Sequence, residues 1–156
     1  MNAVKKARNL ILLAAWCVAP AIGFAAPCAG TNINTTLLWE EYEITKGTKM
    51  AVWRGASVTI SDDASAPYHM VVGECIGTLI YNPDGTGQGS GFCARADKDG
   101  DVLNEEWVRF YGTESKGTWK NVGGTGKFAN AANTAKWEDI WEQGKAGATR
   151  WVGDCQ

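Results

Sequence analysis

Glu74 is the residue of this sequence best placed to transfer a proton. It interrupts a largely apolar run over residues 70–80. A carboxyl group buried among apolar side chains has a raised pKa and can act as an acid or a base. The structural alternative is an ion pair with Arg54 or Arg95 inside the protein. We therefore take Glu74 as a candidate catalytic residue, and Glu74 and Arg54 as candidate ligand-binding residues.

His69 is the second candidate for proton transfer, and it is the only histidine of the chain. It follows Asp62 and Asp63 closely, with Ser61 and Ser65 in the same segment. A histidine oriented by an aspartate and placed beside a serine is the arrangement of a nucleophilic site. Nothing in the spacing fixes that geometry, so a structural or exposed histidine is the alternative. The sequence contains no recognisable catalytic set.

Asp97, Asp99 and Asp101 are the candidate metal ligands. A calcium loop of the EF-hand type has glycine at its sixth position and a late glutamate. Here Gly100 stands at the fourth position and Val102 at the sixth. The segment therefore favours a hairpin turn with solvated acids over a surface calcium site. A site built from several histidines is excluded, and we expect no metal and no cofactor.

Tryptophan is abundant in this chain, which has eight of them in 156 residues. Large rings can serve as stacking platforms for a flat ligand, or they can fill a small glycine-rich interior. The second use is expected for most of them. Trp53 and Trp107 are the candidates for contact with a small apolar or aromatic ligand.

The first residues have the pattern of a cleavable export signal. Lys5, Lys6 and Arg8 form a basic start, and an uncharged apolar run follows over residues 10–24. That run is shorter than the roughly 20 residues needed to span a bilayer. The pattern predicts a signal peptide over residues 1–25 and no membrane span after cleavage. We expect the mature protein to be periplasmic or secreted.

The mature chain, from residue 26 to the end, is acidic. Removal of the three basic residues leaves 12 Lys and Arg against 17 Asp and Glu, a formal charge of about −5. An acidic surface disfavours nucleic acid as a partner. The length suffices for one domain.

Four cysteines remain after the signal: Cys28, Cys75, Cys93 and Cys155. An even number in an exported chain predicts two disulfides, whereas zinc ligands come as closer pairs. The segment 82–86 predicts a three-residue hairpin loop, because Pro83 fixes φ and Gly85 supplies a positive φ. If that loop joins two paired strands, Cys75 faces Cys93. Cys28 then pairs with Cys155.

The same hairpin divides the side chains of residues 70–96 between two faces of a sheet. One face contains Glu74, Ile76 and Phe92. The other contains Leu79, Arg95 and several glycines. We expect the face with Ile76 and Phe92 to be the interior, because it has the greater apolar bulk.

The secondary structure of the mature chain is predicted to be all β. Short runs of strand-forming residues alternate with Gly, Asp and Asn turns, after an irregular lead-in over residues 26–36. The expected domain, residues 37–156, is a single antiparallel up-and-down barrel of about eight strands, cross-linked by disulfides. The eight predicted strands are 37–44, 51–60, 70–81, 86–96, 102–111, 117–122, 134–141 and 148–155.

Several short motifs resemble those of a group of small exported bacterial proteins of unknown function. They are Ser61-Asp62-Asp63, Pro67-Tyr68-His69-Met70, Asp99-Gly100-Asp101-Val102, Gly117-Thr118-Trp119 and the glycine-rich segment 123–128. The glycine-aromatic stretch is similar to that of allene oxide cyclase and dirigent-type barrels. The resemblance covers roughly residues 37–155 and implies an eight-stranded antiparallel barrel with an internal apolar cavity. No cyclase active-site residue matches position by position, and after Phe128 the chain departs from the glycine-rich pattern.

The sequence therefore leads us to expect an exported, non-enzymatic barrel that binds a small apolar or aromatic molecule in its interior. Two alternatives remain open. One is a cyclase or isomerase in which Glu74 or His69 moves a proton. The other is a structural or protein-interaction module with a filled core and an exposed apolar patch.

Overall fold

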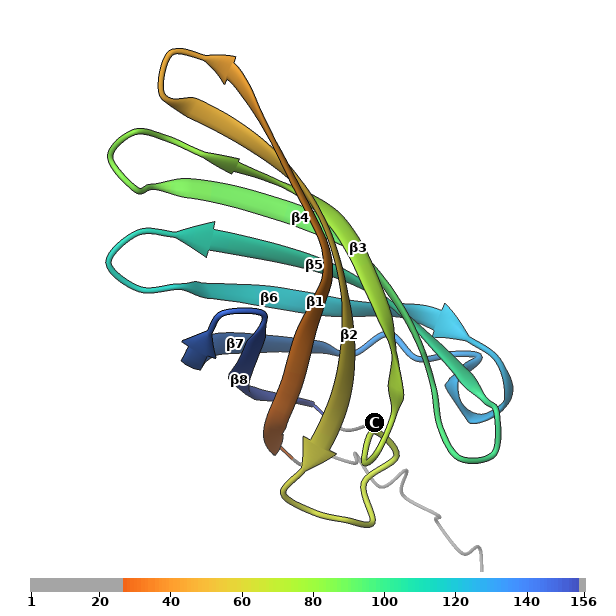
Figure 1. Cartoon of the computed structure of the whole chain (residues 1–156). Helices are drawn as coiled ribbons and strands as arrows, with labels where there is room; N and C mark the ends of the chain where they lie inside the picture. Colours follow the sequence, from red (N-terminus) through yellow and green to blue (C-terminus); the bar gives the residue numbers. More distant parts are fainter. Residues whose placement is uncertain (1–26, 155–156) are drawn as a thin grey trace, which may run out of the picture.

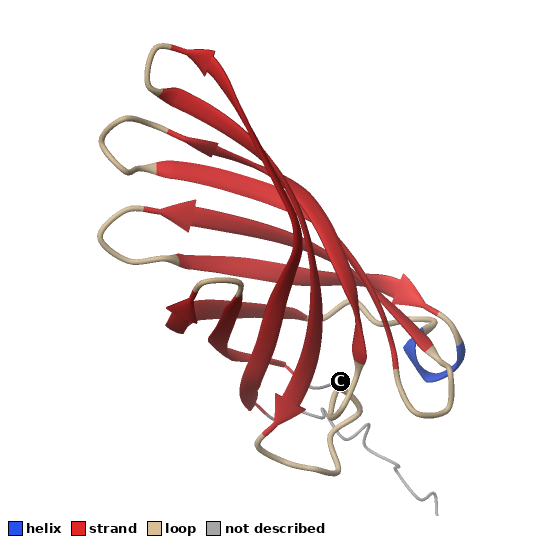
Figure 2. Cartoon of the chain, viewed as in Figure 1, coloured by secondary structure: helices blue, strands red, loops and turns tan. Residues whose placement is uncertain are grey.

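The described part of the chain is a closed antiparallel barrel of eight strands in sequential order (Figure 1). The computed structural model describes residues 27–154, and the predicted signal peptide, residues 1–25, lies outside them. Apart from one short 3-10 helix, η1, the regular structure is all strand (Figure 2). The elements are β1 (Pro27–Thr45), β2 (Thr48–Ser61), β3 (Val72–Tyr81), β4 (Gly87–Ala96), β5 (Val102–Tyr111), β6 (Lys116–Gly124), η1 (Gly126–Phe128), β7 (Thr134–Gln143) and β8 (Ala146–Asp154).

The predicted fold class is confirmed, and one part of the predicted domain layout is wrong. Residues 27–36, expected to be an irregular lead-in, form the first half of β1. This half pairs with β2 on one side and with β8 on the other, so it closes the barrel. Its alternation of small and polar residues lacks the apolar signal of a strand, which is why the sequence pattern missed it.

The two ends of the barrel differ. At one end, the mouth, the turns of the β1–β2, β3–β4 and β5–β6 hairpins spread apart (Figure 1). At the other end, the base, side chains from the β2–β3 and β6–β7 connections pack together with β5. This cluster consists of Tyr68, Val71, Leu103 and Phe128, with the Tyr68 and Phe128 rings stacked at 5.9 Å. The base is therefore closed by apolar side chains.

The predicted register of the β3–β4 hairpin is confirmed, but the predicted interior face is wrong. Cys75 pairs with Cys93 as expected. Ile76 and Phe92, expected inside, have exposed fractions of 54% and 60%. Leu79 and Arg95 of the opposite face are buried. The glycine-rich face points inward because bulky rings from other strands occupy the space above it.

The interior is packed by tryptophan rings that lie over glycines of neighbouring strands. Trp107 of β5 pairs with Gly91 of β4, which pairs in turn with Gly77 of β3. A methyl group at Gly91 would come within 2.6 Å of the Trp107 ring and would also overlap the carbonyl oxygen of Ile76. The same relation joins Trp137 to the facing Gly117. Each ring needs the room that a missing Cβ provides.

We expect Gly91→Ala to lower the free energy of unfolding by about 2 kcal/mol, because the added methyl overpacks the interior. Gly112→Ala is the matched control. Gly112 lies in the β5–β6 turn, and an added methyl there has no heavy atom within 4 Å. That variant should stay within about 0.5 kcal/mol of the parent. Urea unfolding followed by tryptophan fluorescence measures both. Equal stability of the two variants would contradict this account of the packing.

The disulfide between Cys75 and Cys93 joins β3 to β4 across the interior face. Their Cα atoms are 4.0 Å apart, as in a directly facing pair of an antiparallel ladder that is not hydrogen-bonded. The second predicted bond joins Cys28 to Cys155. Cys28 is disulfide-bonded and lies in β1 opposite Gly153, whereas Cys155 is outside the described residues.

The Cys75→Ala/Cys93→Ala double variant should lose about 3 kcal/mol of stability, because the cross-link restricts the unfolded chain over a separation of 18 residues. Thr78→Ala/Ser90→Ala is a control on the same two strands, since these two exposed residues also face each other. Chemical denaturation of both variants gives the comparison. A loss of less than about 1 kcal/mol in the cysteine variant would show that the strand pairing alone fixes the hairpin.

Candidate functional site

A cavity of about 170 Å³ opens at the mouth of the barrel. A cavity of about 150 Å³ holds one benzene molecule, so this space suits a single-ring ligand. Its wall is rich in aromatic side chains, which come from β1, β2, β3, β5, β6 and β7. They are Trp39, Trp53, Tyr81, Trp107, Tyr111, Trp119, Trp137 and Trp141.

Trp53 and Trp107, the predicted ligand contacts, both line this cavity. Their rings meet edge to face with centroids 5.7 Å apart. The indole N–H of Trp53 donates to the Thr36 hydroxyl at 3.1 Å. The indole N–H of Trp107 is buried and has no acceptor among the residues that the structure describes. The two rings are held by packing, and one polar group of the wall is left unpaired.

A pair of tyrosines lies nearer the mouth. The Tyr81 and Tyr111 rings are 4.6 Å apart, and their hydroxyl oxygens are hydrogen-bonded at 3.0 Å. Burial raises the pKa of both phenols, so both are protonated at neutral pH. The Tyr81 hydroxyl donates to the Tyr111 oxygen, so the proton of the Tyr111 hydroxyl has no acceptor within the pair. The Trp39 ring extends this aromatic wall, 5.8 Å from that of Tyr81.

Arg109 places a positive charge among these rings. Its guanidinium lies over Tyr111 at 4.6 Å and over Trp137 at 5.5 Å from the ring centroids. The Nη2 group donates to the Asp139 carboxylate and is 3.9 Å from Glu142. Burial raises the pKa of Asp139, and the charge of Arg109 opposes that shift. The pair puts a cation and an anion side by side in a largely aromatic wall.

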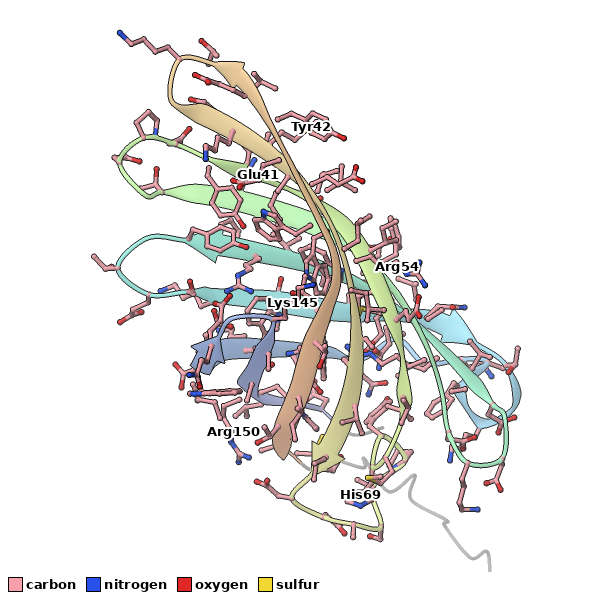
Figure 3. All side chains as sticks on the ribbon, viewed as in Figure 1. Glu41, Tyr42, Arg54, His69, Lys145 and Arg150 are labelled. Carbon is pink, nitrogen blue, oxygen red and sulfur yellow. A yellow bond between two sulfur atoms is a disulfide. The ribbon has the colours of Figure 1, made fainter. Side chains whose placement is uncertain are left out.

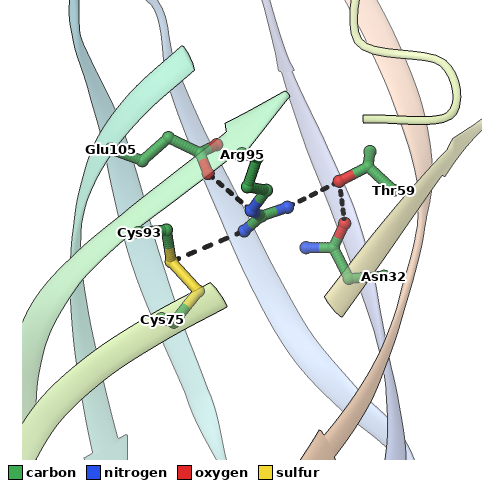
Figure 4. Close-up of a disulfide and its surroundings, with 6 residues drawn as sticks. All are labelled: Asn32, Thr59, Cys75, Cys93, Arg95 and Glu105. Carbon is green, nitrogen blue, oxygen red and sulfur yellow. Dashed lines mark hydrogen bonds and ion pairs between the residues drawn. A yellow bond between two sulfur atoms is a disulfide. The ribbon is translucent and has the colours of Figure 1, made fainter. Parts of the chain in front are cut away.

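A second ion pair forms the floor of the cavity (Figure 4). Arg95 Nε lies 2.8 Å from the Glu105 carboxylate, and both side chains are almost fully buried. Arg95 Nη1 donates to the Thr59 hydroxyl at 2.6 Å, and this hydroxyl donates to the amide oxygen of Asn32 at 2.7 Å. Burial raises the pKa of Glu105, against the effect of the neighbouring guanidinium. These contacts tie strands β1, β2, β4 and β5 together beneath the cavity.

Glu74 and Arg54 lie outside the barrel, so the prediction that Glu74 is buried is wrong. The two side chains are half exposed and form an ion pair at 2.7 Å. Figure 3 shows Arg54 on the outer face of the barrel. The hydrogen bond from Arg54 lowers the pKa of Glu74. A solvated, paired carboxylate on this face cannot contact a molecule held in the cavity. The predicted partnership with Arg54 exists, but on the side opposite to the one expected.

His69 lies at the base of the barrel, far from the mouth (Figure 3). Its Nδ1 is 3.2 Å from the backbone carbonyl oxygen of Ser61. The Ser65 hydroxyl donates to Asp63 at 2.7 Å instead of approaching the imidazole. The structure therefore does not assemble the serine, histidine and aspartate of a nucleophilic site here.

Asp97, Asp99 and Asp101 belong to the β4–β5 turn, where Gly100 adopts a φ of 85°. Asp97 accepts the backbone N–H groups of Asp99 and Asp101, and it pairs with Lys127. Within residues 27–154, no group of three or more His, Cys, Asp or Glu side chains is arranged to hold a metal ion. These acids act in turn formation and in attachment of the β6–β7 connection.

The polar residues of the cavity, apart from Arg95, were missed by sequence reasoning. Glu105, Arg109 and Tyr111 alternate along β5 with Leu103 and Trp107 on the same inward face. That period of two predicts a strand. On this face, however, every second residue is charged, a pattern that favours a face exposed to solvent. A signal that could have identified the inner face is a tryptophan facing a glycine when β4 and β5 are paired, as Trp107 faces Gly91.

Comparison with protein-family models, with curated proteins and with solved structures found no match to this chain. The resemblance to allene oxide cyclase and dirigent-type barrels therefore stays a prediction. Among residues 27–154 there is no helix with the length and apolar character of a membrane span.

Glu105→Gln should lower the free energy of unfolding by about 3 kcal/mol, because it leaves the buried guanidinium of Arg95 without a counter-charge. Glu74→Gln is the matched control. It removes the same charge from an exposed pair on the outer face and should leave stability unchanged. Denaturant unfolding at neutral pH measures both variants. A Glu105 variant as stable as the parent would show that Glu105 is protonated in the folded protein.

Proposed function

We propose that this protein is an exported, non-enzymatic barrel that binds one small aromatic molecule in the cavity at its mouth. The observation that carries the proposal is the cavity itself, with a volume near that of one substituted ring and walls of tryptophan and tyrosine. Aromatic pairs add about 1 kcal/mol beyond the burial of their area, so such walls favour a flat ring over an aliphatic chain.

The construction of the two ends supports this role. The base is closed by the cluster around Phe128, and the floor is locked by the Arg95–Glu105 pair. The mouth remains open, with aromatic side chains such as Trp39 and Trp141 about half exposed. A ligand would enter at the mouth and stop at the floor. Concave, largely preformed and mostly aromatic sites of this kind are typical of small-molecule binding.

The alternatives fit the geometry less well. The enzyme hypothesis relied on Glu74 or His69, and neither lines the cavity. The structural hypothesis requires a filled core, whereas this barrel has an open space. Its second requirement, exposed apolar residues, is met by Ile76 and Phe92 on the outer face.

Binding is tested by titrating the protein with benzyl alcohol and following the indole N–H resonances by NMR. The Trp53 and Trp107 signals should shift and saturate. Trp39→Ala should raise the Kd for benzyl alcohol about fivefold, because it removes one aromatic contact of the wall. Tyr42→Ala is the control, since Tyr42 is a similarly exposed aromatic residue on the same β1–β2 hairpin that does not line the cavity.

Two results would reject the proposal. One is the absence of any shift of the Trp53 and Trp107 signals at saturating probe. The other is equal weakening by the Trp39 and Tyr42 variants, which would indicate contact with the outside of the hairpin. Native mass spectrometry of protein exported by a bacterial host complements this test, because a retained stoichiometric mass would begin to identify the natural ligand.

A further inference from the structure

The polar groups of the cavity wall contain more unsatisfied donors than acceptors. Of the three guanidinium nitrogens of Arg109, only Nη2 bonds an acceptor in the part of the chain that the structure describes. Arg109 Nε and Trp107 Nε1 are buried without an acceptor. The Tyr81–Tyr111 pair has one hydroxyl proton beyond its shared hydrogen bond. Unpaired buried donors cost free energy, and an incoming acceptor recovers it.

The acidic groups of the same wall already have partners. Asp139 accepts a hydrogen bond from Arg109. Glu105 is paired with Arg95 at the floor. Glu142 is largely exposed and lies 3.9 Å from Nη2 of Arg109. Each carboxylate that lines the cavity therefore already has a guanidinium nitrogen within 4 Å.

Two aromatic rings of the wall already hold a cation. The guanidinium of Arg109 already lies against Tyr111 and Trp137. A ligand cation would have to displace it or stand beside a like charge. A carboxylate, by contrast, would meet the free edge of the guanidinium and the spare tyrosine proton.

We infer that the ligand is a single-ring aromatic carboxylate whose ring packs against Trp53 and Trp107 and whose carboxylate accepts hydrogen bonds from Arg109 and the Tyr81–Tyr111 pair. This inference rests on the proposed function and names its ligand class. Guanidinium and phenol donors recognise carboxylates by charge-assisted hydrogen bonds, which are about twice as strong as neutral ones.

The test compares three probes of one ring each: benzoate, benzyl alcohol and benzylammonium. At neutral pH, benzoate should bind at least about tenfold more tightly than benzyl alcohol, and benzylammonium should bind most weakly. Arg109→Gln should raise the Kd for benzoate about tenfold and leave that for benzyl alcohol nearly unchanged. Arg54→Gln is the control, because it removes the same charge from the outer face and should affect neither probe.

Removal of Arg109 also strips Asp139 of its partner and can unfold the barrel. Tyr111→Phe avoids that difficulty, because it deletes one hydroxyl and keeps the ring. It should weaken benzoate binding about fivefold, with circular dichroism and thermal unfolding close to those of the parent.

The outcomes separate the inference from the proposed function. Equal affinity for benzoate and benzyl alcohol, or tightest binding of benzylammonium, would overturn the inference that the ligand has a carboxylate. The proposal of a barrel that binds an aromatic molecule would then still stand. Benzoate affinity that is insensitive to both Arg109→Gln and Tyr111→Phe overturns the assigned contacts. Failure of all three probes to bind overturns the proposed function as well.

Discussion

The constraint on which the whole structure depends is the narrow interior of a closed eight-stranded barrel. Such a barrel has room for its own side chains or for one small ligand. Here the room is set by tryptophan rings that lie over glycines of neighbouring strands, as Trp107 does over Gly91 and Gly77. Each ring of this kind therefore depends on the register of two or three strands. A one-residue slip would remove its glycines and turn the ring outward.

Charged residues share the inner face with the rings and the glycines. Arg95 stands on β4 beside the inward glycines of that strand. On β5, Glu105 and Arg109 flank Trp107 along the same inward face. Each charge is paired, Glu105 with Arg95 and Arg109 with Asp139. Pairing is what makes burial tolerable, since an isolated buried charge would cost several kcal/mol.

Local patterns in the sequence predicted the topology well and the two faces poorly. The 82–86 turn and the equal distances of Cys75 and Cys93 from it predicted the β3–β4 register, because loop length determines which residues face each other. Apolar bulk then favoured Ile76 and Phe92 as interior residues, and this was wrong. The rings that fill the space above the glycines come from other strands, such as Trp107 from β5. Which face of a strand points inward is thus decided by contacts with distant strands. Choosing the wrong face led to the prediction that Glu74 is buried, and Arg109 was not recognised as a cavity residue.

The charged side chains near the mouth have fewer hydrogen-bond partners than the charged pairs at the base and the floor. At the base, Asp97 is bound by Lys127 and two backbone N–H groups. At the floor, Arg95 reaches Glu105 and Thr59. Toward the mouth, Arg109 has one bonded nitrogen and the tyrosine pair has a spare proton. A protein that only needed a filled barrel would gain stability by satisfying these groups or replacing them with apolar ones. Unpaired hydrogen-bond donors beside the cavity lower the stability of the empty barrel, and a bound acceptor would remove that loss.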